Sequence, residues 1–308
     1  MLRIDIHDVG HGHCGLVTAP DGTRIMIDCG SDSRRGWWPS MNYKGQYVDL
    51  LILQNLDEDH VQDLPNVWSH VPLGGIFTNP TVTASALSSM KTQGMCSGVQ
   101  FVHSLLSFYQ PGVVFGRLPL SGGGGMYSWA AWNRYGVDCV NTNDLSLLTF
   151  VHYGDFTVLF AGDLERAGWK TLLQNPLVRA ALPTVKLMVA SRHGRKNGCS
   201  EDAFRLMRPD LVVFSDDAIT YESQDTIGWY RQRTKSLPDF SKPFDAATGY
   251  PRRHVLTTRR DGSLTVNVQP NGEYLIRTER DAGTYFLPLP GAPGAGQSRN
   301  ALALQLHF

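Results

Sequence analysis

Three apolar runs in this sequence each end in an aspartate or a histidine, and this pattern constrains the fold more than any other. The runs occupy residues 50–53, 157–161 and 185–190, and each has the β-rich character of a buried strand. Loops just past a strand end carry ligands on a rigid scaffold, so the runs predict an α/β fold with a metal site at one sheet edge. The residues that follow the runs are Asp57, Asp59 and His60, then Asp163, then His193. An aspartate after a strand also suits an Asx turn or a helix N-cap, and Asp163 taken alone leaves that alternative open.

Several segments together resemble the metallo-β-lactamase superfamily. They are Asp8-Val9-Gly10-His11-Gly12-His13, Arg24-Ile25-Met26-Ile27-Asp28-Cys29-Gly30, Asn55-Leu56-Asp57-Glu58-Asp59-His60, Asn143-Asp144-Leu145-Ser146-Leu147, Ala161-Gly162-Asp163 and Arg192-His193-Gly194-Arg195. Their order and spacing over residues 1–220 are most similar to the metallohydrolase domain of competence-type DNA-internalisation proteins, here in a soluble, stand-alone form. The resemblance implies an αββα sandwich of two mixed sheets with helices outside, and a metal-dependent hydrolase activity.

The chain departs from the family pattern at one of its two metal positions. The family's His-x-His-x-Asp-His segment supplies two histidines to one position, and here Asn55 and Asp57 replace them. The resemblance implies that the other position is intact, with the ligands Asp59, His60, Asp163 and His193. The altered position keeps Asp57 and Asp163, with Asp144 or Asn143 as a further candidate. Arg192 replaces the first histidine of a His-His-Gly sequence, and Arg195 replaces a serine.

The donor types limit which metal ion this site would hold. Imidazole nitrogen favours Zn²⁺, whereas carboxylate and amide oxygen favour harder ions such as Mn²⁺. The resemblance and the two histidines favour Zn²⁺, as one or two ions, and the oxygen-rich set also suits Mn²⁺. Three alternatives stay open: one tightly held ion, an oxygen-rich pair of ions, or a decayed site on a scaffold that only binds.

The glycine loop near the N-terminus contains two histidines, His11 and His13. In one interpretation, one of them is a replacement ligand or a proton donor near neutral pH. His13 is the better catalytic candidate, since it stands at the family's aspartate position. In the other interpretation, both are loop histidines bonded to the backbone. Asp8 is expected to brace this loop, and Asp28 to orient the ligands from beneath.

The length and composition of the chain predict one large domain. The chain has 308 residues, of which 42% are hydrophobic, enough to bury a sizeable core. We expect a single domain over residues 1–285, with a core at 1–220 and an additional helix and β-hairpin at 221–285. The helix is expected over 221–235, and the hairpin is expected to join strands at 254–258 and 263–268. A further strand is expected at 112–118. The Pro/Gly-rich tail at 286–308 could dock on a protein partner or on a second copy of the chain.

Two further features bear on where the protein works. No stretch reaches the ~18 consecutive apolar residues of a membrane helix, and the N-terminus lacks a signal-peptide pattern. The five cysteines are odd in number and irregularly spaced, which favours reduced thiols over a disulfide framework. We therefore expect a cytoplasmic protein without a membrane partner.

Charge near the predicted site indicates an anionic substrate. The net charge is zero, which argues against a sequence-independent coat on DNA. Arg192, Arg195 and Lys196 nevertheless surround His193, and cations beside a metal suit phosphodiesters. The expected substrate is nucleic acid or a nucleotide.

The sequence therefore predicts a phosphodiesterase or nuclease that works through a metal-activated water. Asp59 is expected to orient the water, and Arg192 or Arg195 to offset charge in the transition state. One rival is a hydrolase of non-phosphate esters, lactones or thioesters on the same scaffold. Another is a binding or regulatory module with a degenerate metal site.

Overall fold

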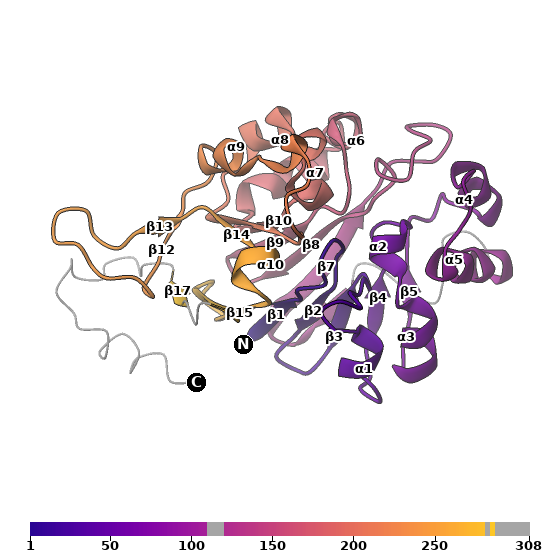
Figure 1. Ribbon diagram of the computed structural model, residues 1–308, viewed down its shortest axis with the longest axis horizontal. Helices are drawn as coiled ribbons and strands as arrows, with labels where there is room; N and C mark the ends of the chain where they lie inside the picture. Colours follow the sequence, from indigo (N-terminus) through magenta and orange to yellow (C-terminus); the bar gives the residue numbers. More distant parts are fainter. Residues whose placement is uncertain (110–119, 281–283, 287–308) are drawn as a thin grey trace.

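The computed structural model describes residues 1–109, 120–280 and 284–286. Two mixed β-sheets pack face to face, and helices cover the outer side of each sheet (Figure 1). This arrangement confirms the predicted αββα sandwich. The predicted strand at 112–118 lies outside the described residues, and so does the predicted tail except for Phe286.

The described residues form two large sheets and one small one. In spatial order, the first sheet contains β17 (Thr284–Phe286), β16 (Tyr274–Thr278), β15 (Leu264–Val268), β1 (Leu2–Ile6), β2 (Gly15–Thr18), β3 (Arg24–Ile27), β4 (Leu50–Ile52) and β5 (Ile76–Phe77). The second contains β14 (Val255–Thr257), β11 (Leu211–Phe214), β10 (Leu187–Val189), β9 (Phe156–Phe160), β8 (Leu148–Tyr153), β7 (Met126–Ala131) and β6 (Leu120–Gly122). The small sheet pairs β12 (Leu237–Pro238) with β13 (Arg252–Arg253).

The helices fall into two groups along the chain. The first group, on the side of the first sheet, contains α1 (Pro39–Asn42), α2 (Glu58–Val61), α3 (Leu64–His70), α4 (Ala84–Met90) and α5 (Ser97–Phe108). The second group contains α6 (Arg166–Leu172), α7 (Pro176–Ala181), α8 (Glu201–Leu206) and α9 (Ile227–Arg231), and α10 (Thr258–Asp261) links the two sheets. Short 3₁₀ helices are η1 (Gly123–Gly125), η2 (Leu182–Thr184), η3 (Ser191–Gly194), η4 (Lys196–Gly198) and η5 (Glu222–Gln224).

Alternation along the strands produces three stacked apolar layers. On β9, Phe156, Val158 and Phe160 face the space between the sheets, and Leu159 faces the helices. The same alternation on β4 sends Leu51 toward the first helix group. Period-two alternation places neighbouring side chains on opposite faces, so strands with both faces apolar bury both. This burial rigidly positions the loops at the strand ends.

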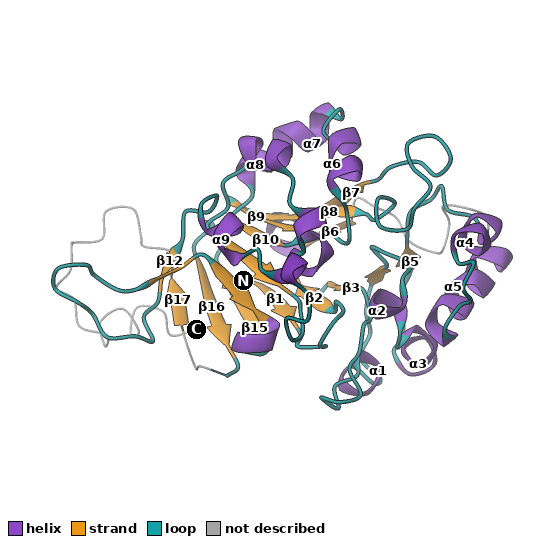
Figure 2. Cartoon of the chain, turned by 45° about the horizontal axis from the view of Figure 1, so that its top comes forward, coloured by secondary structure: helices purple, strands orange, loops and turns teal. Residues whose placement is uncertain are grey.

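The expected hairpin of strands at 254–258 and 263–268 is wrong. The first of these, β14, pairs in parallel with β11 in the second sheet. The second, β15, pairs antiparallel with β1 and β16 in the first sheet (Figure 2). The Arg-Asp-Gly sequence between them forms the end of α10 and its cap, not a hairpin turn. The true hairpin joins β15 to β16, and the helix expected over 221–235 is limited to α9 after η5.

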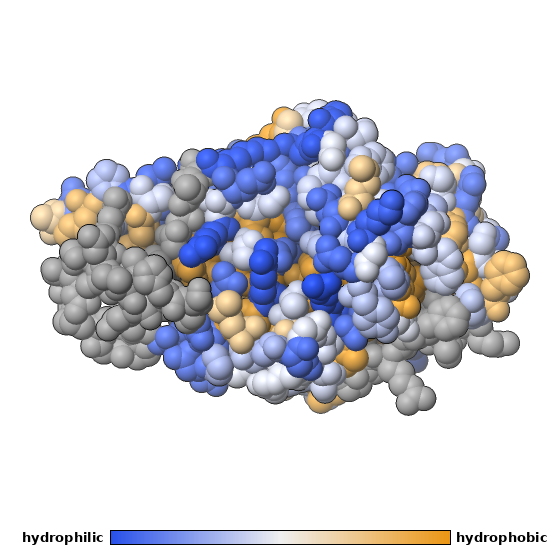
Figure 3. Space-filling model, turned by 90° about the horizontal axis from the view of Figure 1, so that it is seen from below, coloured by the Kyte–Doolittle hydropathy of each residue, from blue (hydrophilic) through white to orange (hydrophobic). Residues whose placement is uncertain are grey.

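On the face seen from below, the described residues form no broad apolar area. Hydrophobic areas there are small and separated by hydrophilic side chains (Figure 3). None of the helices in the described part of the chain is both long and apolar enough to cross a bilayer. None of the five cysteines forms a disulfide.

The packing of α5 against α2 yields a first prediction. A Cβ atom at Gly98 would overlap the Val61 carbonyl oxygen, which is backbone and cannot rotate away. We expect Gly98→Ala to lower the free energy of unfolding by about 1–3 kcal/mol, the usual cost of overpacking. Urea denaturation followed by circular dichroism measures this change.

Gly228→Ala on α9 is the matched control, because a Cβ atom there meets nothing within 4 Å. Its free energy of unfolding should be unchanged or raised by about 0.4–1 kcal/mol. Equal unfolding midpoints for the two variants would contradict the tight contact between α2 and α5.

Candidate metal centre

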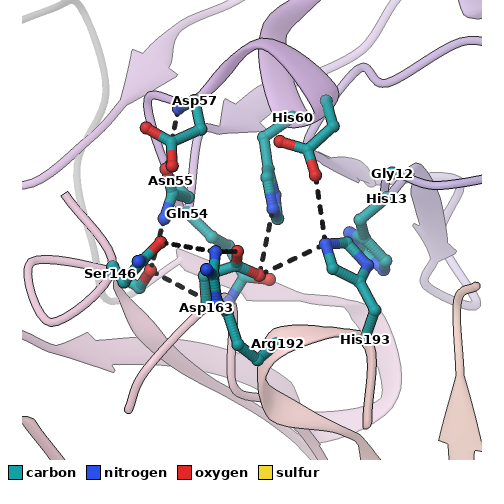
Figure 4. Close-up of polar contacts among 12 residues, drawn as sticks. Gly12, His13, Gln54, Asn55, Asp57, His60, Ser146, Asp163, Arg192 and His193 are labelled. Carbon is teal, nitrogen blue, oxygen red and sulfur yellow. Dashed lines mark hydrogen bonds and ion pairs between the residues drawn. The ribbon is translucent and has the colours of Figure 1, made fainter. Parts of the chain in front are cut away.

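Four of the predicted ligands converge at the carboxyl ends of three strands. One ligand atom from each of Asp59, His60, Asp163 and His193 lies within 4.8 Å of every other. Asp59 and His60 belong to α2, which follows β4. Asp163 follows β9, and His193 belongs to η3 after β10. Figure 4 shows His60, Asp163 and His193 facing one another.

The polar atoms of this group share one small volume. Oδ1 of Asp163 lies 3.2 Å from Nε2 of His60 and 3.4 Å from Nε2 of His193. Oδ2 of Asp59 lies 3.2 Å from Nε2 of His193. Two nitrogens and two carboxylate oxygens therefore face a common point, as they would around a tetrahedral ion.

The far nitrogen of each imidazole is held by a hydrogen bond. Nδ1 of His60 lies 2.8 Å from Oδ2 of Asp28, and Nδ1 of His193 lies 2.8 Å from the Ser215 carbonyl oxygen. When Nδ1 carries the proton and donates it in this hydrogen bond, Nε2 of the neutral imidazole keeps a free lone pair, which a metal ion needs. Nε2 of His193 is buried and forms no hydrogen bond, although the two carboxylate oxygens lie 3.2 and 3.4 Å from it. These observations fit a divalent ion held by the four residues.

Opposite charges within the group stabilise the ionised forms of its histidines and aspartates. Burial opposes the charged form of His60, but the Asp28 and Asp163 carboxylates outweigh it and raise its pKa well above the ordinary value. Burial likewise opposes ionisation of Asp163, yet His193 and His60 hold its pKa well below the usual range. The group is therefore an ionised network, and uptake of a metal ion has to release protons from the imidazoles.

An unusual backbone turn presents His193. Arg192 and His193 both adopt left-handed backbone conformations, with φ of 56° and 54°. Such a conformation costs a non-glycine residue about 1–2 kcal/mol, so surrounding contacts have to maintain it. The Arg192 amide donates to the Gly162 carbonyl at 3.0 Å, and the Thr226 hydroxyl donates to the Gly194 carbonyl. The first contact ties the turn to the residue before Asp163.

The N-terminal loops brace the other side of the centre. The Cys29 amide donates to the His60 carbonyl at 2.8 Å, and the His13 amide donates to the Asp59 carbonyl at 3.3 Å. A Cβ atom at Gly30 would overlap the Asp59 carbonyl oxygen, so only glycine permits this approach. Asp28 accepts at Oδ1 from the Gln54 amide at 2.7 Å, as the orienting role predicted for it requires.

The two histidines of the glycine loop lie at different depths. His13 is buried, and its Nδ1 lies 3.1 Å from Oδ2 of Asp28, so it supports the residue that orients His60. His11 is nearer the ligands: its Nε2 lies 3.6 Å from Oδ2 of Asp59, and its ring centroid lies 4.4 Å from that of His193. Burial lowers the pKa of His11 to about 4, with His193 adding to the effect. A catalytic role for His13 stays a prediction, and His11 is better placed to meet a substrate.

Asp57 is not part of the group of four. Its carboxylate pairs with Lys91, and its amide donates to Oδ1 of Asn55 at 2.7 Å. The Asn55 side chain also donates to Oγ of Ser146 at 3.0 Å. Asp144, a further candidate for the altered position, accepts at Oδ1 from the Glu165 and Gly168 amides at the start of α6. Sequence reasoning missed Lys91, because lysine is not a ligand type, and it included Ser146 in the Asn143–Leu147 segment without giving it a role.

The two arginines beside the centre have different partners. Nη1 of Arg192 donates to Oδ2 of Asp163 and to Oδ1 of Asn143, both at 2.9 Å. Nη2 of Arg195 lies 3.3 Å from Nε2 of His11. Within residues 1–109, 120–280 and 284–286, no carboxylate forms an ion pair with Arg195. Arg195 therefore carries a positive charge at the centre that no described carboxylate neutralises.

Comparison with known proteins found similarity to solved structures alone. No protein-family model and no curated protein sequence matches the chain. Solved structures similar to it include a CmlA beta-hydroxylase E377D mutant, with 13% identity over 86% of this chain and 54% of that chain and a TM-score of 0.47. A diphosphatase from the PhnP family has 10% identity over 87% of this chain and 98% of that one, with a TM-score of 0.45. A protein of unknown function from Enterococcus faecalis V583 has 13% identity over 61% of this chain and 49% of that one, with a TM-score of 0.37.

This chain spans about half the length of the first and third of these structures. Its own sheet order, layered core and His–Asp group define a metallo-β-lactamase-like αββα sandwich with a candidate metal centre. The competence-protein branch within that fold stays a prediction.

Removal of one ligand should abolish stabilisation by metal. Zn²⁺ at about 100 times its dissociation constant should raise the wild-type free energy of unfolding by about 2.7 kcal/mol. We expect no such gain in His193→Ala, which lacks one imidazole of the group. The measurement is urea denaturation with and without Zn²⁺, alongside metal content by mass spectrometry. Asp57→Ala is the control and should keep the full gain, and an equal loss in both variants would refute the four-residue centre.

The carboxylate beneath the histidines should control metal affinity. Asp28→Asn keeps the size of the side chain but weakens its hold on His60, so we expect about 10–100-fold weaker Zn²⁺ binding by calorimetry. Asp144→Asn, a buried carboxylate outside the group, should bind Zn²⁺ like the wild type. Unchanged affinity in Asp28→Asn would show that the Asp28–His60 contact does not orient the ligand.

Proposed function

We propose that this protein is a metal-dependent hydrolase of phosphodiesters that acts on nucleic acid or nucleotides. The observation that carries the proposal is the guanidinium of Arg195, which has no carboxylate partner among the described residues and lies beside a converged set of four metal ligands. Arginine binds phosphate with two parallel hydrogen bonds, so its location suits an anionic substrate.

The residues that would hold the ion are Asp59, His60, Asp163 and His193. A set of two imidazole nitrogens and two carboxylate oxygens favours Zn²⁺ and also accepts Mn²⁺. When bound, a divalent ion supplies a Lewis acid that polarises a phosphoryl oxygen and lowers the pKa of water. Asp28 and the Ser215 carbonyl hold the two imidazoles in the orientation that this role requires.

Asp59 is the residue of the group best placed to handle a proton. Its side chain is 24% exposed, whereas those of His60 and Asp163 are almost fully buried. Burial opposes its ionisation, but His60 and His193 lower the pKa of Asp59 to about 2. It is therefore a carboxylate at neutral pH and can orient a water molecule by accepting a hydrogen bond.

Arg195 and His11 form the side of the centre that a substrate would meet. Both residues are partly exposed, and neither is a member of the ligand group. Arg195 supplies donors for the non-bridging phosphate oxygens, which gain charge in the transition state. His11 is neutral at pH 7, because its pKa is about 4, and it can accept or donate a hydrogen bond without adding charge.

The alternative substrates do not fit the positive charge of Arg195 as a phosphodiester does. Non-phosphate esters, lactones and thioesters carry no anionic group at the reacting centre, so they leave the guanidinium without a partner. A module that only binds would not need the two oriented imidazoles. The guanidinium and the two oriented imidazoles therefore favour phosphodiester hydrolysis over both alternatives.

The test is an activity screen with defined metal content. Purified protein loaded with Zn²⁺, Mn²⁺ or Mg²⁺ is assayed on bis(p-nitrophenyl) phosphate, single-stranded DNA, RNA, a lactone and a thioester. Phosphodiester cleavage that disappears in His193→Ala, with folding retained, supports the proposal. Turnover of the lactone or thioester alone would replace it with the first alternative, and an inert metal-loaded protein would replace it with the second.

Arg195→Ala should lower kcat/KM, because the lost hydrogen bonds serve both the bound substrate and the transition state. A hydrogen bond to a charged group contributes about 1.5–3 kcal/mol, so we expect kcat/KM for bis(p-nitrophenyl) phosphate to fall about tenfold or more. Steady-state kinetics measures kcat/KM. Arg205→Ala is the control, because Arg205 lies on α8 and pairs with Asp202. An unchanged kcat/KM in Arg195→Ala would remove Arg195 from the substrate site.

A further inference from the structure

We infer that the Arg192 guanidinium occupies the place of a second metal ion, so the centre holds one ion and one fixed arginine cation. The metal count follows from the geometry alone, and the catalytic role of the cation rests on the proposed function. The inference decides between the one-ion and two-ion alternatives that the ligand types leave open.

The two oxygens of Asp163 face different partners. Oδ1 faces the imidazole nitrogens of His60 and His193, at 3.2 and 3.4 Å. Oδ2 accepts a hydrogen bond from Nη1 of Arg192 at 2.9 Å. A carboxylate that bridges two metal ions would give one oxygen to each ion. Here the second oxygen is already taken by a cation that belongs to the chain.

Oxygen atoms from separate segments surround this guanidinium. Besides Oδ2 of Asp163, Nη1 contacts Oδ1 of Asn143 at 2.9 Å, and Nε lies 3.4 Å from Oε1 of Glu165. Carboxylate and amide oxygens of this kind are ligands for hard divalent ions. The structure therefore contains an oxygen-lined cation position next to the group of four, and Arg192 fills it. Figure 4 shows Arg192 against Asp163.

Asn55 and Asp57 replace the two histidines of the altered metal position. Their side chains are not ligands of the cation position that Arg192 fills. The amide of Asn55 donates to Ser146 and to the Thr142 carbonyl, while its oxygen accepts from the Asp57 amide. The Asp57 carboxylate pairs with Lys91. Both potential donors to a second ion are thus committed to contacts within the chain.

The left-handed turn explains how neighbouring residues reach opposite oxygens of one carboxylate. Arg192 contacts Oδ2 of Asp163, whereas His193, the next residue, faces Oδ1. Both residues have positive φ, and the Arg192 amide donates to Gly162 beside Asp163. The turn therefore places the chain's own cation and a metal ligand side by side.

A guanidinium and a metal ion respond differently to pH and to chelators. Arginine stays protonated throughout the accessible pH range, and chelators cannot extract it. It cannot act as a Lewis acid toward water, but it can hold Asp163 in position and offset negative charge nearby. Under the proposed function, Arg192 is a positioning residue for the single ion.

Metal counting in four proteins tests the inference. Each protein is saturated with Zn²⁺, desalted, checked for folding by circular dichroism and analysed for ions per chain by mass spectrometry. The proteins are the wild type, Arg192→Ala, the double variant Asn55→His/Asp57→His, and the triple variant that combines all three changes. We expect one ion per chain in the first three proteins, because each either lacks the two added histidines or keeps the Arg192 guanidinium. We expect two ions per chain in the triple variant, which has the histidines and lacks the guanidinium.

Two ions in the wild type, or two in the double variant with Arg192 intact, would overturn the inference and leave the proposed hydrolase standing. One ion in a folded triple variant would also overturn it, because the guanidinium would not be what excludes the second ion. No ion in the wild type would instead remove the basis of the proposed function. Anomalous diffraction from the Zn²⁺-loaded wild type needs no variant: a peak between Asn143, Asp163 and Glu165 overturns the inference, and a single peak at the four ligands supports it.

Discussion

A fully buried carboxylate, that of Asp163, sets the requirement that the rest of the centre meets. Its residue is 1% exposed, and an isolated charge at that depth would be costly by several kcal/mol. His60, His193 and Arg192 offset this cost from three directions, and the Asp163 amide donates to Ser146. The loops after β4, β9 and β10 meet around this one side chain, so the two sheets have to be in register for the charge to be satisfied.

The strands of the centre were predicted from local signals, and its four candidate ligands from the family resemblance that the same segments carry. Each apolar run is followed within a few residues by its candidate ligands, and parallel strands bring their carboxyl ends to the same edge. The direction of the Arg192 side chain could not be read in this way. It depends on a left-handed turn held by Gly162 and Thr226, which are distant in sequence. The partner of Asp57, Lys91, is likewise 34 residues away.

The predicted pairing of strands 254–258 and 263–268 was wrong for a related reason. Residues 255–257 and 264–268 both have β character and are separated by a turn-like Asp-Gly sequence, which is a local hairpin signal. Their burial differs: β14 is buried along its whole length, whereas β15 alternates. Continuous burial suits a parallel strand covered on both faces, and alternation suits an antiparallel strand. That contrast identifies two different sheets more reliably than the turn residues do.

The position of β15 has a consequence for synthesis of the chain. This strand pairs with β1 along five residue pairs, from Leu2 with Val268 to Ile6 with Leu264, so the first strand made waits for one of the last. Until then β1 has an open edge on the side away from β2, and open strand edges invite pairing with other molecules. Such distant pairing also delays folding, because a long loop has to close first. A nascent chain that stalls before residue 264 would therefore be prone to aggregate, even though every ligand of the metal centre has already been made.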